Sequence, residues 1–206
     1  MEIAAFPADK PDLRRQLAGL LAACFACYRE DPAAEVESLL QSERLALCAL
    51  EGDTLLGFIG AIPQYGAEER DGLSRATGWE LHPLAVLPQR QGEGIGAALT
   101  AALERAAADR GASMLYLGCD DEDGRTSLSA ADLSADPWEA VRNIRNLGRH
   151  PYTFYEKQGY RIVGVLPDAN GPGKPDILMA KPVGRRGAGN CSGGCKKCWA
   201  YVEPTA

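Results

Sequence analysis

Residues 77–96, TGWELHPLAVLPQRQGEGIG, constrain the fold most strongly, because a strand-like run, a proline inside it and a glycine-rich loop follow one another. Glu80, His82 and Leu84 stand at every second position, so the period of a strand predicts that they share one face. Pro83 has no N–H to donate to a sheet, which predicts a bulge or a separation from a parallel neighbouring strand. Such a separation would open a slot and leave a nearby amide, that of Leu84, free for the carbonyl group of a ligand.

The loop QGEGIG, residues 91–96, leads into an alanine-rich stretch that predicts a helix from about Ile95 to Arg110. Glycines let the backbone approach a ligand closely, and a helix N-terminus offers unpaired N–H groups. A pyrophosphate group is therefore the expected ligand of this loop. A dinucleotide-binding loop would follow its strand directly, whereas Pro88, Gln89 and Arg90 intervene here. Taken alone, the loop is equally compatible with a helix-capping turn.

The composition describes one soluble globular domain of 206 residues, 46% of them hydrophobic and 24% charged. The formal charge of −6 argues against nucleic acid as the main partner and weakly favours cationic ligands. No apolar run reaches the roughly 18–20 residues that cross a bilayer, and four of the seven cysteines lie scattered in apolar segments, as reduced thiols do. We therefore expect a cytoplasmic protein without a membrane segment. The run RRQLAGLLAAC resembles a lipoprotein cleavage site, but the acidic residues and prolines before it favour an amphipathic helix.

The remaining segments predict an α/β fold. Helices are expected over about 12–28 and 32–40, and again from Pro137 and from Pro151. Strands are expected at 2–6, in a hairpin around the Gly52-Asp53 turn, at SMLYLGC, and in the closing runs RIVGVLPD and DILMAKP, while 65–76 reads as a polar loop. The domain is expected over residues 1–183, followed by a glycine- and cysteine-rich tail, 184–206, whose composition predicts flexibility.

The pattern V-x-P-x-x-Q-G-x-G-I-G, which begins at Val86, resembles motif A of the GCN5-related acetyltransferases, whose loop binds acetyl-coenzyme A. Longer strings, GFIGAIPQYG, TGWELHPLAV, YLGCDDED, HPYTFYEKQGY and IVGVLPDANGPGKPDILMAK, resemble the aminoglycoside 6′-N-acetyltransferases of this superfamily over residues 1–183. The resemblance implies an α/β (α+β) acetyltransferase fold whose mixed central sheet is splayed between its fourth and fifth strands and flanked by helices. It also implies acetyl-CoA as co-substrate, an aminoglycoside or other polycationic amine as acceptor, and a homodimer.

On the matching positions, the resemblance makes Glu80 the general base, sets His82 beside the acceptor amine and the Leu84 amide at the thioester carbonyl, and puts Tyr155 near the sulfur. A tyrosine, with a pKa of about 10 against about 8.5 for a thiol, is a modest proton donor to a departing thiolate. Plainer interpretations are a rim carboxylate, a core histidine and a packing tyrosine. His150 stands at a helix start and is expected only to cap it. The residues expected to bind acetyl-CoA are Leu84, Val86, Gln91, Gly92, Gly94, Ile95, Gly96 and Tyr155.

A polycationic acceptor needs carboxylates, because each ammonium group costs energy to desolvate unless it is paired. The resemblance sets Asp120 and Asp121, where the fifth strand ends, against the aminoglycoside together with Trp79, Glu80 and His82, although Trp79 also suits the core. Two other functions stay open: acetylation of another amine, such as a polyamine or a protein lysine, and a non-catalytic regulator that binds CoA or a metal. Acidic residues that would extend a negative rim are Glu122, Asp123, Asp136, Glu139, Asp168 and Asp176, of which the first two fit a solvated turn better.

Cys191, Cys195 and Cys198 have the spacing that radical enzymes use for an iron–sulfur cluster, but a short tail offers no barrel to enclose radical chemistry. Zinc with Cys24 and Cys27 is the alternative, yet these two thiols more simply pack on one helix face. We therefore expect no metal.

Overall fold

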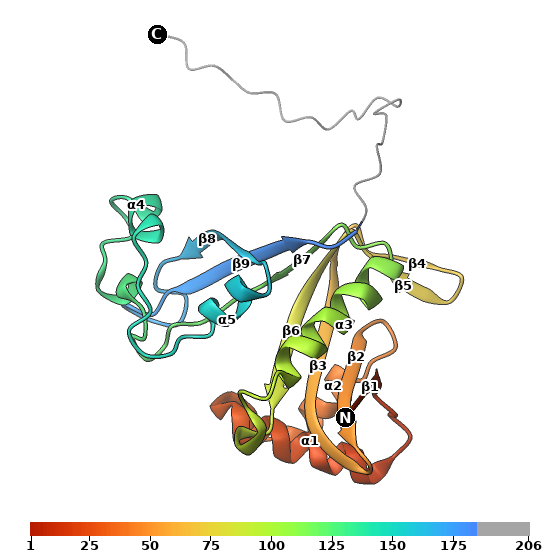
Figure 1. The fold of residues 1–206 in the computed structure, drawn as a ribbon. Coiled ribbons are helices and arrows are strands. Elements are labelled where there is room, and N and C mark those ends of the chain that lie inside the picture. Colours follow the sequence, from red (N-terminus) through yellow and green to blue (C-terminus); the bar gives the residue numbers. More distant parts are fainter. Residues whose placement is uncertain (185–206) are drawn as a thin grey trace, which may run out of the picture.

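The computed structural model describes residues 1–184, which form a seven-stranded mixed sheet flanked by helices (Figure 1). Cys191, Cys195 and Cys198, and the expectations for the tail, lie outside this part of the chain. Across the sheet the strands are β1 (Glu2–Ala5), β2 (Leu45–Glu51), β3 (Thr54–Tyr65), β6 (Gly78–Val86), β7 (Met114–Leu117), β9 (Asp176–Pro182) and β8 (Arg161–Leu166). The longer helices are α1 (Pro11–Cys24), α2 (Pro32–Leu39) and α3 (Ile95–Asp109), and the shorter ones are α4 (Pro137–Arg142) and α5 (Tyr152–Lys157).

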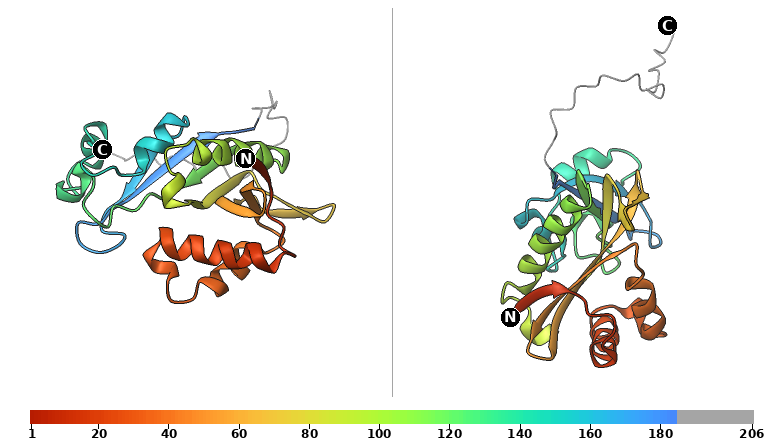
Figure 2. Two further views of the ribbon diagram at one scale, coloured as in Figure 1. Left: turned by 60° about the horizontal axis from the view of Figure 1, so that its bottom comes forward. Right: turned by 90° about the vertical axis from the view of Figure 1, so that its right-hand side faces the viewer.

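Helices cover both faces of the sheet, with α1 and α2 on one side and α3 on the other (Figure 2). α1 begins with Pro11, whose missing N–H costs nothing in a first turn, and buries leucines at positions 13, 17, 20 and 21. α3 buries Ile95, Leu99, Leu103 and Ala107 on one stripe. The two faces consequently carry separate hydrophobic clusters, which we call the α1 core and the α3 core.

The sheet divides where β6 meets β7. Their parallel pairing covers only Gly78–Glu80 against 114–116, although β6 continues to Val86. Figure 1 shows the two strands diverging beyond this point, and β7 then continues alongside β9. These are the fourth and fifth strands of the sheet order, so the predicted splay is confirmed.

A bulge lies at the divergence. Leu81 pairs with Ala61 and Leu84 pairs with Ile59, so His82 and Pro83 together oppose Gly60 alone. A side chain at Gly60 has no room, because a Cβ there would lie 2.6 Å from the His82 carbonyl oxygen. The predicted bulge is therefore confirmed.

The bulge changes which way the side chains of β6 face. Leu81 belongs to the α3 core and Leu84 packs against it, whereas Ala85 belongs to the α1 core. Directly paired residues share a face. The partners of Leu81 and Leu84 on β3 likewise belong to the α3 core, and the partner of Ala85 belongs to the α1 core. The expectation that Glu80, His82 and Leu84 share one face was wrong, because the extra residue reverses the alternation before Leu84.

Two further segments differ from the sequence expectations. The first helix ends at Cys24, and a 3₁₀ turn, η1 (Ala26–Tyr28), follows it. The polar loop between β3 and β6 forms a small hairpin of its own, β4 (Glu68–Arg70) with β5 (Leu73–Arg75). The predicted hairpin of β2 and β3 is confirmed, with Gly52 at a φ of 61° in its turn. Within residues 1–184, we find no helix with the length and apolarity that a bilayer crossing requires.

Candidate active site

The glycine-rich loop ends at an open helix terminus. Gly92 and Gly94 have φ angles of 85° and 84°, in the left-handed region that favours glycine, and no atom lies within 4 Å of a Cβ built at either. Gly94 is the N-cap of α3 and supplies no side-chain hydrogen bond, so the first N–H groups of this 15-residue helix have no side-chain cap. Arg90 holds the loop, because its guanidinium pairs with Glu93 at 2.8 Å and with Glu51 at 3.3 Å. The chemistry of this terminus suits an anion such as a diphosphate.

The backbone of β6 turns toward the divergence after the bulge. The Leu87 amide donates to the Leu56 carbonyl on β3, and hydrogen-bonded and non-hydrogen-bonded pairs alternate along an antiparallel ladder. Leu84 and Val86 therefore fall in non-hydrogen-bonded pairs, and their backbone groups point away from β3. The Val86 carbonyl accordingly accepts from side chains, from Cys24 Sγ at 3.5 Å and from Gln91 Nε2 at 3.3 Å.

Glu80 is held by one side chain from each neighbouring strand. Its Oε2 accepts from Gln64 Nε2 on β3 at 3.1 Å and from the Tyr116 hydroxyl on β7 at 3.3 Å. Burial, and then the charge of Glu80, raises the pKa of Tyr116, so this hydroxyl stays a neutral donor. Sequence reasoning missed both partners, although Tyr116 stands in the predicted strand SMLYLGC and pairs directly with Glu80.

His82 contacts a residue that the sequence did not single out. The Tyr28 hydroxyl lies 3.0 Å from His82 Nε2, and the two rings meet edge to face with centroids 6.4 Å apart. Burial, and then the charge of Glu35, raises the pKa of Tyr28 to about 12. Nothing in the sequence indicated this contact, because the two residues are 54 positions apart and meet only where η1 packs against β6.

Tyr155 lies on α5, next to Phe154. It is 8% exposed, stacks edge to face on Phe154 and Tyr160, and makes no hydrogen bond through its hydroxyl within residues 1–184. Burial raises its pKa, with a smaller contribution from Cys119. The neighbouring Phe154 ring would lie 3.4 Å from a Cβ at Gly96, so α5 packs against the first turn of α3.

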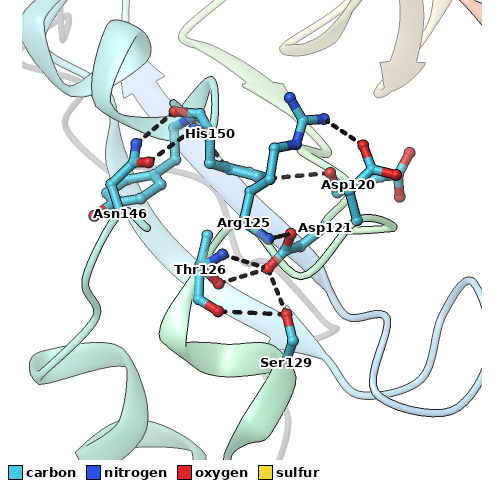
Figure 3. A network of polar contacts seen from close by, with 9 residues as sticks. Asp120, Asp121, Arg125, Thr126, Ser129, Asn146 and His150 are labelled. Carbon is cyan, nitrogen blue, oxygen red and sulfur yellow. Dashed lines mark hydrogen bonds and ion pairs between the residues drawn. The ribbon is translucent and has the colours of Figure 1, made fainter. Parts of the chain in front are cut away.

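Two residues that were expected to contact the acceptor are enclosed instead. Asp121 is fully buried, and its carboxylate accepts from the amides of Arg125 and Thr126 and from the hydroxyls of Thr126 and Ser129, at 2.6–2.9 Å (Figure 3). Burial alone would raise the pKa of Asp121, but these hydrogen bonds lower it. Trp79 is also fully buried, with its indole N–H on the Ala76 carbonyl at 3.1 Å. Asp121 therefore holds its loop, Trp79 fills the core, and both side chains are closed off from solvent in this structure.

Asp120 remains exposed and has a carboxylate neighbour on β9. Its Oδ1 accepts from Asn170 at 2.5 Å, and its backbone forms an isolated bridge with Asp176. Burial, and then the charges of Asp120 and Glu80, raises the pKa of Asp176. A Cβ at Gly118 would lie 2.6 Å from Asp176 Oδ2, so a side chain there would displace this carboxylate. Three carboxylates, Glu80, Asp120 and Asp176, thus share one negative field where the strands part.

His150 does cap α5, as expected, and it also reaches the acidic turn. Its Nδ1 accepts from the Tyr152 amide at 3.3 Å, and its Nε2 lies 3.0 Å from the Asp120 carbonyl oxygen, which has no proton to give. The Nε2 atom therefore carries the proton of a neutral imidazole, and burial lowers the pKa of His150. Figure 3 shows this side chain between Asn146 and Asp120. The ring joins the helix that carries Tyr155 to the turn that carries Asp120.

The part of the chain that the structure describes holds no group of three or more His, Cys, Asp or Glu side chains arranged to bind a metal ion.

Comparisons with known proteins agree with this geometry. The model of the acetyltransferase (GNAT) family matches residues 14–129. A crystal structure of an aminoglycoside 6′-N-acetyltransferase complexed with coenzyme A is 48% identical, with a TM-score of 0.83, and the match covers 89% of this chain and 97% of that one. The aminoglycoside 6′-N-acetyltransferase from Enterococcus faecium, also 48% identical, has a TM-score of 0.81, and a type Ii aminoglycoside 6′-acetyltransferase, 42% identical, has a TM-score of 0.68; the coverage is the same for both. No curated protein sequence matches the chain. The matched family model and these solved structures show that the chain belongs to the GNAT family of acetyltransferases.

Proposed function

We propose that this protein transfers the acetyl group of acetyl-CoA to the 6′-amino group of aminoglycoside antibiotics. One observation carries the proposal: the bulge in the split sheet sets Glu80 and His82 on the face opposite Leu84 and the glycine-rich loop. Such a division suits two substrates that approach one reaction centre from different sides. The three solved enzymes that share 42–48% of this sequence support the choice of acceptor.

The donor side is assigned to β6 and the start of α3. In this assignment the amides of residues 92–96 bind the diphosphate of acetyl-CoA, where the helix terminus favours an anion. Leu84, Val86, Gln91 and Ile95 line the path of its pantetheine arm. The Leu84 N–H donates to the thioester carbonyl and to the oxyanion that develops on it, the kind of preorganised donor that lowers a barrier to acyl transfer.

The chemistry is a direct attack by the acceptor amine on the thioester carbon. The amine must be neutral to attack, so Glu80 removes a proton from the ammonium group, directly or through water. The C–S bond breaks as the C–N bond forms, and the departing thiolate accepts a hydrogen bond from Tyr155. The second proton that the amine nitrogen loses passes to this thiolate through water, so CoA leaves as the thiol. Because the pKa of Tyr155 is raised, it remains protonated and acts as a hydrogen-bond donor more than as an acid.

The acceptor side is assigned to the three carboxylates and His82. An aminoglycoside carries several ammonium groups, and Glu80, Asp120 and Asp176 supply negative charge to more than one of them. Burial, and then the charges of Asp120 and Glu80, raises the pKa of Asp176, and a bound cation would relieve the repulsion between these carboxylates. Acetylation removes one positive charge from the antibiotic, and resistance is the role that we propose for it.

We further propose that the protein acts as a homodimer in the cytoplasm, where acetyl-CoA is available. Val163 and Leu166 of the sheet-edge strand β8 are 53% and 50% exposed, and an exposed apolar edge strand is a surface that a second copy would cover.

An acceptor panel tests the proposal. Purified protein is mixed with acetyl-CoA, and released CoA thiol is measured with a kanamycin-type antibiotic, its analogue with a 6′-hydroxyl, and spermidine. We expect release with the 6′-amine and none by N-acetylation with the 6′-hydroxyl. Faster turnover of spermidine or of a lysine peptide would transfer the assignment to another amine, and stabilisation by CoA without thiol release for any amine would indicate a regulator.

A further inference from the structure

Tyr28 makes the side-chain contact that fixes His82. We propose that Tyr28 is a positioning residue that holds the His82 ring in one orientation and one tautomer, with the proton on Nδ1. The contact is a hydrogen bond of 3.0 Å at Nε2, reinforced by the perpendicular packing of the two rings. The kinetic consequence of this inference rests on the proposed function, whereas the tautomer does not.

Tyr28 is itself well anchored. The Phe25 ring packs against it edge to face at 5.4 Å, and Tyr28 ends the 3₁₀ turn η1 that follows α1. Four residues before it, Cys24 Sγ donates to the Val86 carbonyl at 3.5 Å. Cys24 at the end of α1 therefore contacts β6 beyond the bulge, and Tyr28 of η1 contacts it at the bulge. Tyr28 reaches His82 from a braced segment rather than from a free loop.

A protonated hydroxyl can donate or accept, but the Tyr28 hydroxyl makes no other hydrogen bond within residues 1–184, so donation to His82 Nε2 is the direction that gives its proton a partner. Burial and the nearby charge of Glu35 keep the Tyr28 hydroxyl protonated at any pH where the protein works. The hydroxyl donates to Nε2, and a neutral imidazole then carries its own proton on Nδ1. His82 Nδ1 makes no hydrogen bond to another side chain or to the backbone within residues 1–184, so its N–H is available to a water molecule or to the acceptor.

This assignment separates the tasks of two neighbouring residues. With Nε2 already accepting the hydrogen bond from Tyr28, His82 could take up a proton there only if the Tyr28 hydroxyl turned from donor to acceptor. His82 consequently acts as an N–H donor that orients the acceptor or a water molecule, and proton removal is left to Glu80.

The histidine content makes the tautomer directly measurable. The chain has two histidines, His82 and His150. The contacts of His150 require the opposite tautomer, with the proton on Nε2. Nitrogen-15 NMR of histidine-labelled protein should show one imidazole of each kind, and His82→Gln assigns the signals by removing one set.

Tyr28→Phe keeps the packing and removes the hydroxyl. We expect the His82 signals to move toward the Nε2–H tautomer while those of His150 stay unchanged, which also reports that the variant is folded. An Nε2–H tautomer of His82 in the parent protein, or His82 signals that are identical in the variant, would overturn the proposal.

Kinetics provide the second readout. We expect Tyr28→Phe to lower kcat about tenfold, equivalent to one hydrogen bond at a reacting group, with the KM for acetyl-CoA within about twofold. Cys27→Ser changes the exposed neighbour on the same turn and should leave kcat unchanged. In the His82→Gln background, Tyr28→Phe should have no further effect, because the tyrosine acts through the histidine. Equal losses in both backgrounds would refute the positioning role even if the tautomer is as expected.

Discussion

Leu81 and Leu84 face the same hydrophobic core although three positions separate them in one strand, because His82 and Pro83 between them oppose the single residue Gly60. In a regular strand, residues at i and i+3 lie on opposite faces. The additional residue thus places the two side chains before it, Glu80 and His82, on the side of α1, and Leu84 on the side of α3. The first prediction concerns the glycine that permits this arrangement.

Gly60→Ala should destabilise the fold and impair catalysis together. The new methyl group would lie 2.6 Å from the His82 carbonyl oxygen, a backbone atom that cannot move without closing the bulge. We expect a loss of about 1–3 kcal/mol in the free energy of unfolding, measured with urea. Gly19→Ala in α1 is the matched control, because no atom lies within 4 Å of its Cβ, and it should gain about 0.5–1 kcal/mol. If the free energy of unfolding of Gly60→Ala equals that of the parent, the backbone at the bulge can move to accommodate a methyl group, and the prediction is wrong.

Glu80→Gln should lower kcat by about 100- to 10,000-fold, the usual contribution of a general base. The amide oxygen can still accept from Tyr116, so the local structure should persist, and a thermal melt within 2 °C or so of the parent would check this. Glu68→Gln on the exposed strand β4 is the control for charge removal alone. A loss below about fivefold would assign proton removal to another group.

Tyr155→Phe should slow the reaction about tenfold without abolishing it, because a hydrogen bond to the thiolate is lost but the thiol is an adequate leaving group. Tyr160→Phe, in the ring that packs behind Tyr155 at 5.7 Å, should retain most of the parent rate. Complete inactivity of Tyr155→Phe, with CoA binding preserved in calorimetry, would indicate that full proton transfer is obligatory.

Asp120→Asn and Asp121→Asn should differ in kind although they are adjacent. The exposed Asp120 should affect the acceptor, raising its KM about fivefold, as expected for an ion pair worth up to about 1 kcal/mol. The buried Asp121 accepts four hydrogen bonds, some of which an amide nitrogen cannot accept, so its substitution should cost about 1–3 kcal/mol of stability. Urea titrations and acceptor kinetics on both variants measure this contrast, and the reverse pattern would place Asp121 in the acceptor site.

Stability should fall as the pH is lowered from 7.5 to 5.5, in part through His150. Burial lowers the pKa of this histidine in the folded protein, so below the ordinary value of about 6.5 the unfolded chain binds a proton that the folded one does not. The stability that neutral His150 contributes is therefore present above that pH and is lost as the pH falls toward the folded pKa. The loss through this group is at most about 1.4 kcal/mol at pH 5.5. His150→Gln should flatten the profile, and an unchanged slope would place the pH dependence elsewhere.

Local signals predicted the seven strands of the main sheet, its helices and the split, but not the small hairpin of β4 and β5. The missing N–H of Pro83 led to the bulge, and the glycines of 91–96 led to the open start of α3. The reversal of faces was missed because the periodicity of one strand does not show how many residues its partner strand sets opposite it. Here β3 sets the single residue Gly60 opposite two residues of β6. Tyr28, Gln64 and Tyr116 were missed for a related reason: each meets its partner through sheet or helix packing across 16 to 54 residues of chain. The burial of Asp121 was not foreseen, because a carboxylate in an acidic turn looks the same in sequence whether it faces water or closes its own loop.

The inserted residue in β6 also bears on how such a protein diversifies. A sheet ordinarily separates what lies on its two faces, but here one strand presents polar side chains to one face and, two positions later, an aliphatic side chain to the other, with a backbone amide directed into the gap between the parted strands. The surface around α1, η1 and the acidic turn can then be remodelled for a different amine while the nucleotide-binding half keeps its contacts. Substitutions that change antibiotic preference should accordingly cluster on the α1 side and leave acetyl-CoA affinity untouched.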